Sequence, residues 1–542
     1  MRRVRSLSAV LFAVVVSALV GGVFGPSLLA TDDKVSEHYK TFSAALSAIE
    51  SNYVDKADSD RLVYSAIRGM LGTLDPHSSF FDPREYANMR ERQEGRYYGL
   101  GITISDVNGI ITAASVFEGS PAYKLGIRRG DIISKIGIEE TKGWQSQQAQ
   151  TKLRGPKGTS VQIEITRNGY AKPIPMEVTR DEVYISTVPA YFMIDATTGY
   201  IRHKDWGENT DHDIRKALQD LQAQGMQRLL YDIRGNPGGP LDQAIKTANE
   251  FLPRGDMIVY TRGRIPNSDQ DYLATEDSSF TKVPMVVLAN RNSASASEIF
   301  TGAMQDHDRA YIVGETTFGK ALVQSVYRIS GGAGLALTTA HYFTPSGRLI
   351  QRPWDESFDE YLSYQSRDQD GTQKHNPSDL KRTDAGRPVY SGGGIEPDKF
   401  LPGPLEGLGF NPTPAGRLMY LRGDFENYAE KYMAVGDNRV AQPSTGRVSV
   451  APNFEVTDAM VADFKDMLKT AHLKVDEDAF VKDIPFIKAM IRYRIDEAVF
   501  GFGDAQKHEI AVDPEAQLGM TEFGEAQKLL TLGKAALGKP VH

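Results

Sequence analysis

The sequence contains no cysteine among its 542 residues. This absence excludes a disulfide framework, a thiol nucleophile and a zinc site built from cysteine ligands. It also excludes a lipid-modified cysteine behind the N-terminal apolar segment. Because exported and cytosolic proteins alike can do without cysteine, the count leaves the redox compartment undetermined.

The sequence also lacks a stripe of basic residues with interleaved aromatic residues, and its net charge is −8. A chain with this acidic balance is not expected to bind the phosphates of nucleic acid. Its hydrophobic fraction of 40% is ordinary for a soluble protein, but its length is too great for a single hydrophobic core. We therefore expect three or four domains and no nucleic-acid partner.

No stretch after the first thirty residues reaches the ~20 apolar residues needed to span a bilayer. At the N-terminus, three arginines within the first five residues precede an apolar run over 7–20, which is typical of an export signal. A buried helix is the alternative, but the run would leave it no polar face. Residues 1–30 therefore predict a signal peptide that ends at Ala30 or, because Leu28 is larger than the preferred small residue, a retained membrane anchor. We expect a protein of the bacterial periplasm, soluble or anchored to the inner membrane.

The patterning along the rest of the chain predicts a multidomain α+β protein. Apolar residues recur at helical spacing over 35–92, which indicates a small N-terminal helical region. Short β-branched runs separated by glycines over 97–180 indicate a compact β-rich domain. Strand, turn and helix patterns alternate over 182–402, which predicts an α/β layer with a largely parallel sheet and a polar surface insertion at about 355–390. The helical period returns over 403–542 as a C-terminal helical extension, which could cap the core or mediate assembly.

The β-rich domain begins with a glycine turn formed by Gly99, Leu100, Gly101 and Ile102. Consecutive backbone N–H groups in such a turn can bind an anion, and the strand that follows offers an edge to an added peptide strand. Together they would hold the C-terminal carboxylate of a peptide. Further glycine-rich segments follow in an order that resembles a PDZ domain, at 119–122, 126–127, 130–133 and 153–159.

The predicted α/β layer contains a second glycine-rich turn, Asp-Ile-Arg-Gly-Asn-Pro-Gly-Gly at 232–239, directly after a strand pattern. Glycines there let the backbone turn sharply and leave N–H groups unshielded, as an oxyanion site requires. Taken alone, the segment is equally consistent with an ordinary strand-to-helix turn.

A serine-rich segment at 290–299 also follows a buried strand pattern and opens a helix. A serine at such a junction lies near the positive end of the helix dipole, with a free N–H group on the next residue. The alternative is helix capping, because Ser295 and Glu298 have the spacing of a capping box. A hydroxyl nucleophile would in addition need a base.

The candidate base is Lys320, which lies among small and apolar residues at 314–324. Desolvation can hold a buried lysine neutral, and a neutral lysine can take the proton of a serine hydroxyl. No histidine lies in the Gly-x-Ser-x-Gly context of hydrolases. The alternative is an exposed lysine without a catalytic role.

Taken in order, the PDZ-like domain, the turn at 232–239, the serine-rich segment and Phe-Gly-Lys at 318–320 resemble the C-terminal processing peptidases, also called tail-specific proteases. The similarity covers about 35–398. It implies a helical region, then a PDZ domain, then an α/β, crotonase-like serine protease core. It also implies that the reaction uses neither a metal ion nor an organic cofactor. A signature at 74–78 belongs to the same resemblance, but its chemistry predicts only a structural turn.

By this resemblance, Ser295 is the nucleophile, Lys320 is the general base and Gln324 orients the lysine. The N–H groups of Gly239 and Ala296 would form the oxyanion hole. A contact between Lys320 and Gln324 favours an irregular or helical backbone, because residues i and i+4 lie ~6 Å apart in a helix and ~13 Å apart in a strand. Two departures from the family pattern, the proline after Gly239 and the long polar insertion, bear on substrate access and leave the Ser–Lys dyad intact.

The resulting hypothesis is an exported serine endopeptidase that binds protein C-termini through its PDZ domain and cleaves through an acyl-enzyme. Two alternatives stay open at this point. A non-catalytic scaffold would explain the PDZ domain but not the presence of the dyad. An enzyme acting on thioesters or small esters would use the same kind of oxyanion site. An adaptor protein, homo-oligomer formation and membrane association by the N-terminal segment also stay open.

Overall fold

The computed structural model describes residues 33–107, 109–167, 170–354, 358–369, 371–372, 375–403, 410–433 and 450–537. The predicted signal or anchor segment at 1–30 lies outside these residues. Across the helices that are described, none combines the length and the apolar character required to cross a membrane. The chain divides into two compact units, Met1–Glu85 with Val326–Leu337, and Tyr86–Ser325 with Thr338–His542.

The first unit consists of two helices and a small piece of sheet. Its elements are α2 (Asp33–Asn52), α3 (Ser59–Leu71) and β1 (Ser79–Phe81), with the 3-10 turn η2 (Ser330–Gly332). β1 pairs antiparallel with the first residues of β18 (Gly334–Phe343). The Asp75 carboxylate accepts hydrogen bonds from the N–H groups of His77 and Ser78, both at 2.7 Å. The segment at 74–78 is thus a structural turn, as its chemistry predicts.

The second unit begins with a β-rich domain that follows α4 (Pro83–Glu94). Its strands and helices are β2 (Arg96–Gly99), β3 (Ile102–Val107), β4 (Ile110–Val116), α5 (Pro121–Lys124), β5 (Ile132–Ile136), β6 (Glu139–Glu140), α6 (Ser146–Leu153), β7 (Ser160–Thr166), β8 (Ile174–Thr179) and β9 (Asp181–Tyr184). An antiparallel sheet runs in the order β3-β4-β5-β7-β8, and β2 pairs with β9 as a separate ribbon. Inward-facing aliphatic residues of the sheet and of α5 and α6 form one core.

The centre of the second unit is a six-stranded sheet in the order β10-β11-β12-β15-β16-β21. Its elements and the helices between them are β10 (Ala190–Met193), β11 (Thr198–Arg202), α7 (Thr210–Ala223), β12 (Arg228–Asp232), α8 (Leu241–Asn249), β15 (Met285–Ala289), α9 (Ala296–Asp306), β16 (Tyr311–Gly314) and β21 (Lys399–Phe400). All neighbours are parallel except β10, which runs antiparallel to β11. This α/β layer with a largely parallel sheet agrees with the strand, turn and helix pattern of the sequence.

Two further groups of elements accompany this sheet. One is a smaller antiparallel arrangement with a 3-10 turn: β13 (Met257–Arg262), β14 (Gln270–Leu273), η1 (Ser279–Lys282) and β17 (Leu322–Arg328). The other occupies the polar insertion: α10 (Phe358–Ser363), η3 (Tyr364–Ser366), η4 (Pro377–Asp379), β19 (Leu380–Arg382) and β20 (Pro388–Tyr390). The insertion has more regular structure than its polar composition indicates, because Tyr361 is buried against Phe318.

The last third of the chain contains eight helices within the described residues: α11 (Pro414–Leu421), α12 (Asp424–Tyr432), α13 (Asp458–Thr470), α14 (Glu477–Lys482), α15 (Ile484–Val499), α16 (Phe502–Ile510), α17 (Pro514–Thr521) and α18 (Phe523–Leu537). Helices α11 to α15 share an aromatic-rich core of their own. Helices α16 to α18 instead pack on the six-stranded sheet.

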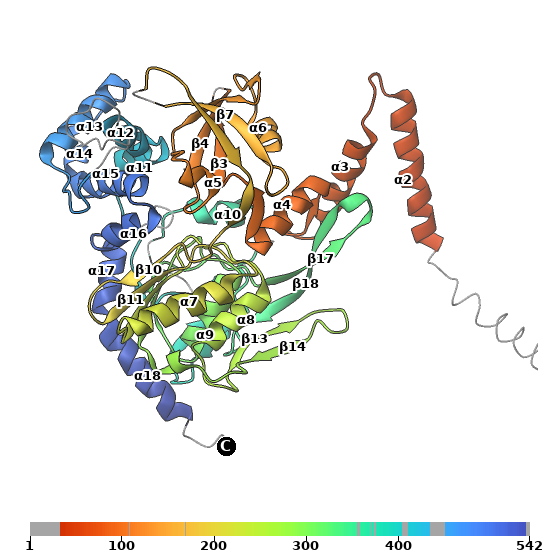
Figure 1. Ribbon diagram of the computed structural model, residues 1–542. Coiled ribbons are helices and arrows are strands. Elements are labelled where there is room, and N and C mark those ends of the chain that lie inside the picture. Colours follow the sequence, from red (N-terminus) through yellow and green to blue (C-terminus); the bar gives the residue numbers. More distant parts are fainter. Residues whose placement is uncertain are drawn as a thin grey trace, which may run out of the picture. The chain divides into compact units, whose positions relative to one another are not determined.

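The six-stranded sheet is covered on both faces, as parallel sheets require. Alternate strand residues such as Leu229 and Tyr231 face α7, α8 and α9, whereas Leu230 and Val286 face α16, α17 and α18. Figure 1 shows α7 to α9 on one side of β10 and β11 and α17 and α18 on the other. The C-terminal helices therefore form one of the two layers that make this sheet a buried core.

We predict that Phe523→Ala lowers the free energy of unfolding by about 3 kcal/mol, because it leaves a cavity between α18 and the sheet. Phe523 is 5% exposed and Leu532, on the same helix, is 52% exposed. Urea denaturation followed by circular dichroism measures the loss, with Leu532→Ala as the matched control. Equal stability of the two variants would mean that α18 does not contribute to the core.

Candidate active site

Ser295 lies at the junction between β15 and α9, where it is the N-cap residue of the helix. Its backbone has φ 54° and ψ −114°, a conformation that a residue with a side chain rarely adopts. Such strain persists only where surrounding contacts enforce it, and it is common at active sites. Contacts around Ser295 must therefore hold this turn in place.

The buried carboxylate of Glu298 holds the turn to the loop that carries Lys320. It accepts hydrogen bonds from the N–H groups of Ser295 at 2.8 Å and Lys320 at 2.9 Å. It also accepts one from the Gly319 N–H group and one from the Thr317 hydroxyl, both at 2.6 Å. Burial raises the pKa of Glu298, although these four donors oppose the shift. One carboxylate thus fixes the backbone of both candidate catalytic residues.

The phenol of Tyr342, on β18, bonds to the same two residues through their carbonyl groups. Its hydroxyl lies 3.1 Å from the Ser295 carbonyl oxygen and 2.6 Å from the Lys320 carbonyl oxygen. The side chain is almost fully buried, and burial together with the nearby Glu298 raises the pKa of Tyr342 well above its ordinary value. The phenol therefore stays protonated and remains a donor at neutral pH.

The structure also brings Lys320 and Gln324 together. The Lys320 Nζ donates to Gln324 Oε1 at 3.2 Å. Lys320 lies in irregular backbone just before β17, and Gln324 lies in the strand. This placement explains how a pair four residues apart makes contact, and it agrees with the expectation of an irregular backbone at the lysine.

The glycine turn at 232–239 lies directly against the serine turn. A Cβ atom on Gly238 would come within 2.7 Å of the Ser295 Cβ and 2.9 Å of the Ala296 nitrogen, so only glycine fits there. A Cβ atom on Gly239 would come within 2.6 Å of the Trp206 Cβ. Among the residues that the structure describes, the N–H groups of Gly239 and Ala296 make no hydrogen bond with a protein acceptor.

Asn236 ties the two turns together. Its carbonyl oxygen accepts hydrogen bonds from the Ala294 N–H group and from the Ser297 hydroxyl, each at 3.0 Å. Ser297 in turn accepts from the indole N–H of Trp206 at 3.0 Å. Ser297 is therefore a buried structural neighbour of Ser295, and Trp206 supports both the glycine turn and the serine turn.

Asp232 is the last residue of β12 and is fully buried. It accepts hydrogen bonds from the Tyr200 hydroxyl at 2.8 Å and the Arg202 guanidinium at 2.9 Å. Burial opposes ionisation, but Arg202 and Arg234 outweigh it and hold the pKa of Asp232 below its ordinary value. Asp232 is thus an ionised structural anchor. Within the described part of the chain, no group of three or more His, Asp or Glu side chains is placed to hold a metal ion.

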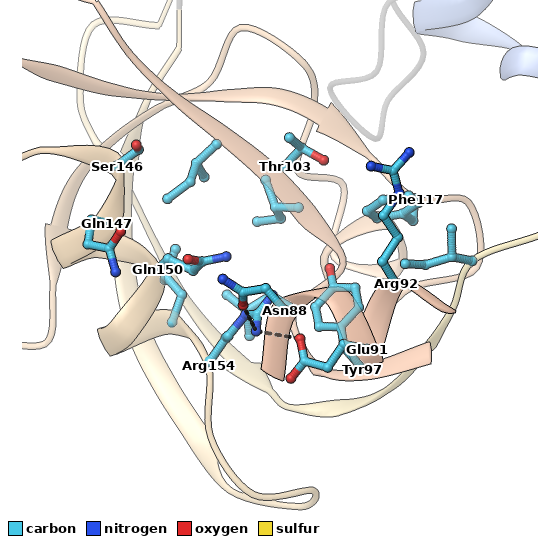
Figure 2. A pocket seen from close by; sticks show the side chains of 15 residues that line it. Asn88, Glu91, Arg92, Tyr97, Thr103, Phe117, Ser146, Gln147, Gln150 and Arg154 are labelled. Atoms are coloured by element: carbon cyan, nitrogen blue, oxygen red, sulfur yellow. Dashed lines mark hydrogen bonds and ion pairs between the residues drawn. The ribbon is translucent and has the colours of Figure 1, made fainter. Parts of the chain in front are cut away.

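The β-rich domain has a pocket of about 290 Å³ between β3 and α6. Figure 2 shows its lining, with Thr103 on one side and Ser146, Gln147 and Gln150 on the other. Leu100 and Ile102, from the predicted carboxylate loop, also line it, and Gly101 has the positive φ of 83° expected of a glycine turn. Gly99 ends β2.

A third wall of this pocket comes from α4. Arg154, at the end of α6, forms an ion pair with Glu91 at 2.5 Å and contacts Asn88 at 3.5 Å, as the dashed lines in Figure 2 show. The Arg154 guanidinium also lies over the ring of Tyr97, and burial raises the pKa of Tyr97 to about 12. The pocket therefore has a mixed lining, in which polar and charged side chains lie beside aliphatic side chains such as Leu100, Ile102 and Leu153.

Several residues of the site carry no sequence signal that identified their role. Glu298 has the spacing of a capping box, which indicates its bond to the Ser295 N–H group but not its contacts with the lysine loop. Tyr342 and Trp206 belong to segments distant in sequence from both turns. Only their folded positions show that they support Ser295.

Three family comparisons match successive parts of the chain. Peptidase family S41 matches residues 197–354, a range that contains Ser295, Lys320 and Gln324. The PDZ domain family matches residues 112–167, and the activating protease CtpB N-terminal domain matches residues 27–84.

The chain is also similar to individual proteins. The chain is 38% identical over 314 residues to a carboxy-terminal-processing protease of Bartonella bacilliformis, an alignment that covers 57% of this chain and 72% of that protein. It is 33% identical over 344 residues to the carboxy-terminal processing protease CtpA of Bacillus subtilis, covering 63% and 73%. A solved structure of a photosystem II D1 C-terminal processing protease is 30% identical and covers 57% of this chain and 89% of that chain, with a TM-score of 0.33.

We predict that Tyr342→Phe slows the reaction of the Ser295 hydroxyl with a fluorophosphonate roughly tenfold, because two carbonyl oxygens lose their shared donor and the two turns shift. Labelling reactions are quenched at a series of times, and the fluorescence of the protein band on a gel gives the rate. Tyr272→Phe, on β14, serves as the control, since the Tyr272 hydroxyl makes no hydrogen bond with another residue in the described part of the chain. An unchanged rate in Tyr342→Phe would contradict a positioning role for the phenol.

Proposed function

The chain belongs to peptidase family S41, the family of the carboxy-terminal-processing proteases, and we propose that it is an exported endopeptidase with a Ser295–Lys320 dyad. It is a serine-type peptidase with a PDZ domain. The observation that carries the proposal is the joint anchoring of both residues by Glu298 and Tyr342. A scaffold protein without catalysis would have no use for this arrangement.

Ser295 supplies the nucleophile in this proposal. Its hydroxyl oxygen attacks the carbonyl carbon of the scissile peptide bond while Lys320, in its neutral form, takes the hydroxyl proton. The strained backbone and the position at the start of α9 support this role, because the positive end of the helix dipole faces the developing negative charge. Gln324 accepts from Lys320 Nζ and so orients the lysine.

The N–H groups of Gly239 and Ala296 are the proposed oxyanion donors. They would bind the carbonyl oxygen as it gains negative charge, and losing one such donor typically costs ~3 to 4 kcal/mol in the transition state. Lys320 then gives its proton to the leaving amine, and an acyl-enzyme remains on Ser295. A water molecule, deprotonated by Lys320, attacks the ester and releases the second product.

The PDZ domain supplies substrate binding in this proposal. The groove between β3 and α6 would accept the C-terminus of a protein substrate as an added strand, with the terminal carboxylate at the loop of Gly99, Leu100, Gly101 and Ile102. The aliphatic side chains of Leu100, Ile102 and Leu153 in the lining favour an apolar last residue. The bound chain would then pass into a crotonase-like core and reach Ser295.

We also propose that the protein is exported from the cytosol. The arginines and apolar run at 1–30 predict a signal or anchor, and a periplasmic location fits an enzyme that processes exported proteins. The location is testable by cell fractionation of a tagged full-length chain. Recovery in the cytosol would contradict this part of the proposal alone.

We predict that Ser295→Ala and Lys320→Ala each lower the cleavage of an unfolded protein with an apolar C-terminus by at least about 1,000-fold, because each removes one half of the dyad. Gel densitometry measures cleavage after circular dichroism has shown that each variant is folded. Lys246→Ala, on the exposed surface of α8, is the control and should retain full activity. Retained cleavage in Ser295→Ala would show that the nucleophile lies elsewhere.

We predict that a peptide with a free C-terminal carboxylate binds the Ser295→Ala protein at least about tenfold more tightly than its C-terminal amide, since hydrogen bonds to a charged group contribute about 1.5–3 kcal/mol. Fluorescence anisotropy with labelled peptides measures both affinities. Equal binding would mean that the loop at 99–102 does not recognise the carboxylate, while the dyad would be unaffected.

A further inference from the structure

A fully buried ion cluster joins the C-terminal helices to the glycine turn at 232–239. Arg234, in that turn, has no exposed side-chain surface, and neither has Asp513, which precedes α17. Glu515, in the first turn of α17, is 1% exposed. The two acids lie 279 and 281 positions after the arginine in the sequence. The contact therefore connects the end of the chain to the middle of the peptidase core.

The guanidinium of Arg234 is held from two directions. On one side, its Nη1 atom donates to Asp513 Oδ2 at 2.8 Å and lies 3.5 Å from Glu515 Oε2. On the other side, its Nε and Nη2 atoms donate to Asp232 at 3.0 and 2.6 Å. A planar guanidinium bonded along two edges has a fixed position and orientation.

The acceptors on α17 are themselves fixed. The second carboxylate oxygen of Asp513 accepts hydrogen bonds from the N–H groups of Glu515 at 2.8 Å and Ala516 at 3.1 Å, so that Asp513 caps the helix. The helix packs closely on the sheet at Gly519, where a Cβ atom would come within 3.0 Å of the Leu288 side chain. Asp513 therefore presents its Oδ2 atom to Arg234 from a rigid support.

The position of Arg234 bears directly on the proposed oxyanion donor. The next residue, Gly235, donates to the Asn290 side chain at 2.9 Å, and Asn236 bonds to the serine turn. Gly239 lies three residues after Asn236 in the same loop. A shift of the arginine would therefore move the loop at 235–239 relative to Ser295.

Stability alone is a weak explanation for this cluster. Burying ions has a large desolvation cost, and replacing buried ion pairs by apolar residues is often neutral or stabilising. Apolar contacts already hold α16, α17 and α18 on the sheet. Directional bonds to Arg234 add what apolar contacts cannot, namely a defined geometry for the loop.

We propose that Asp513 and Glu515 are positioning residues of the peptidase, which hold Arg234 and thereby set the position of the loop at 235–239 that carries the Gly239 N–H group. The inference rests on the proposed function, because it acts through the oxyanion donor of Gly239. In this proposal, the C-terminal helices help to set the geometry of the active site.

The test compares full-length wild type, Asp513→Asn and Glu515→Gln on an internally quenched peptide, with active-site titration to count competent molecules. Asp504→Asn, an exposed acid on α16, is the matched control. Asparagine keeps the capping oxygen of Asp513 but cannot accept from Arg234 with its nitrogen. We expect kcat to fall roughly 10- to 100-fold in Asp513→Asn, with KM within about twofold of wild type, and no change in Asp504→Asn.

A double variant, Arg234→Gln with Asp513→Asn, separates positioning from stability. It removes both charges, so it should regain the melting temperature lost by Asp513→Asn while kcat stays low. Recovery of kcat together with the melting temperature would overturn the inference, as would a normal kcat in folded Asp513→Asn. If Asp513→Asn does not fold, Glu515→Gln decides by the same comparison of kcat with KM, and an unchanged kcat overturns the inference.

The same experiment distinguishes this inference from the proposed function. Ser295→Ala is measured beside the other variants. If Ser295→Ala keeps its turnover, the proposed function fails whatever the acid variants do. If Ser295→Ala is inactive but Asp513→Asn and Glu515→Gln keep a normal kcat, only the positioning role of the C-terminal helices fails.

Discussion

The active-site geometry depends on the buried carboxylate of Glu298. It accepts hydrogen bonds from the backbone of Ser295 and of Lys320, two residues that lie on separate loops. An unpaired carboxylate in this place would be costly, so the fold must bring all four donors to it. The strained backbone of Ser295 is one consequence, since the turn has to present its N–H group to Glu298 and its side chain elsewhere.

The parallel sheet imposes a second constraint, because it must be covered on both faces. Helices α7, α8 and α9 cover one face, and the C-terminal helices α16, α17 and α18 cover the other. Strand ends at one edge of the sheet carry the loops of Asp232 and Ser295. The ion cluster of Arg234 with Asp513 shows how the second layer reaches that edge.

Sequence patterns predicted the parts of this molecule whose signals are local. The strand, turn and helix alternation predicted the α/β layer. Ser295 stood out because its serine-rich segment follows a strand pattern and opens a helix, and Lys320 stood out because it lies among small and apolar residues. The contact of Lys320 with Gln324 was implied by the family resemblance, and the structure contains it. The contributions of Tyr342 and Asp513 could not be predicted, because they arise from segments that only the fold brings together and no motif marks them.

The central claim, a covalent intermediate on Ser295, is tested most directly by mass spectrometry. The enzyme is mixed with an activated peptide ester, quenched in acid within seconds, digested with a second protease and mapped. The account predicts a mass increase equal to the acyl fragment on the peptide that contains Ser295, and its loss on treatment with hydroxylamine. An acyl group on another residue during turnover, with Ser295 unmodified, would contradict the account.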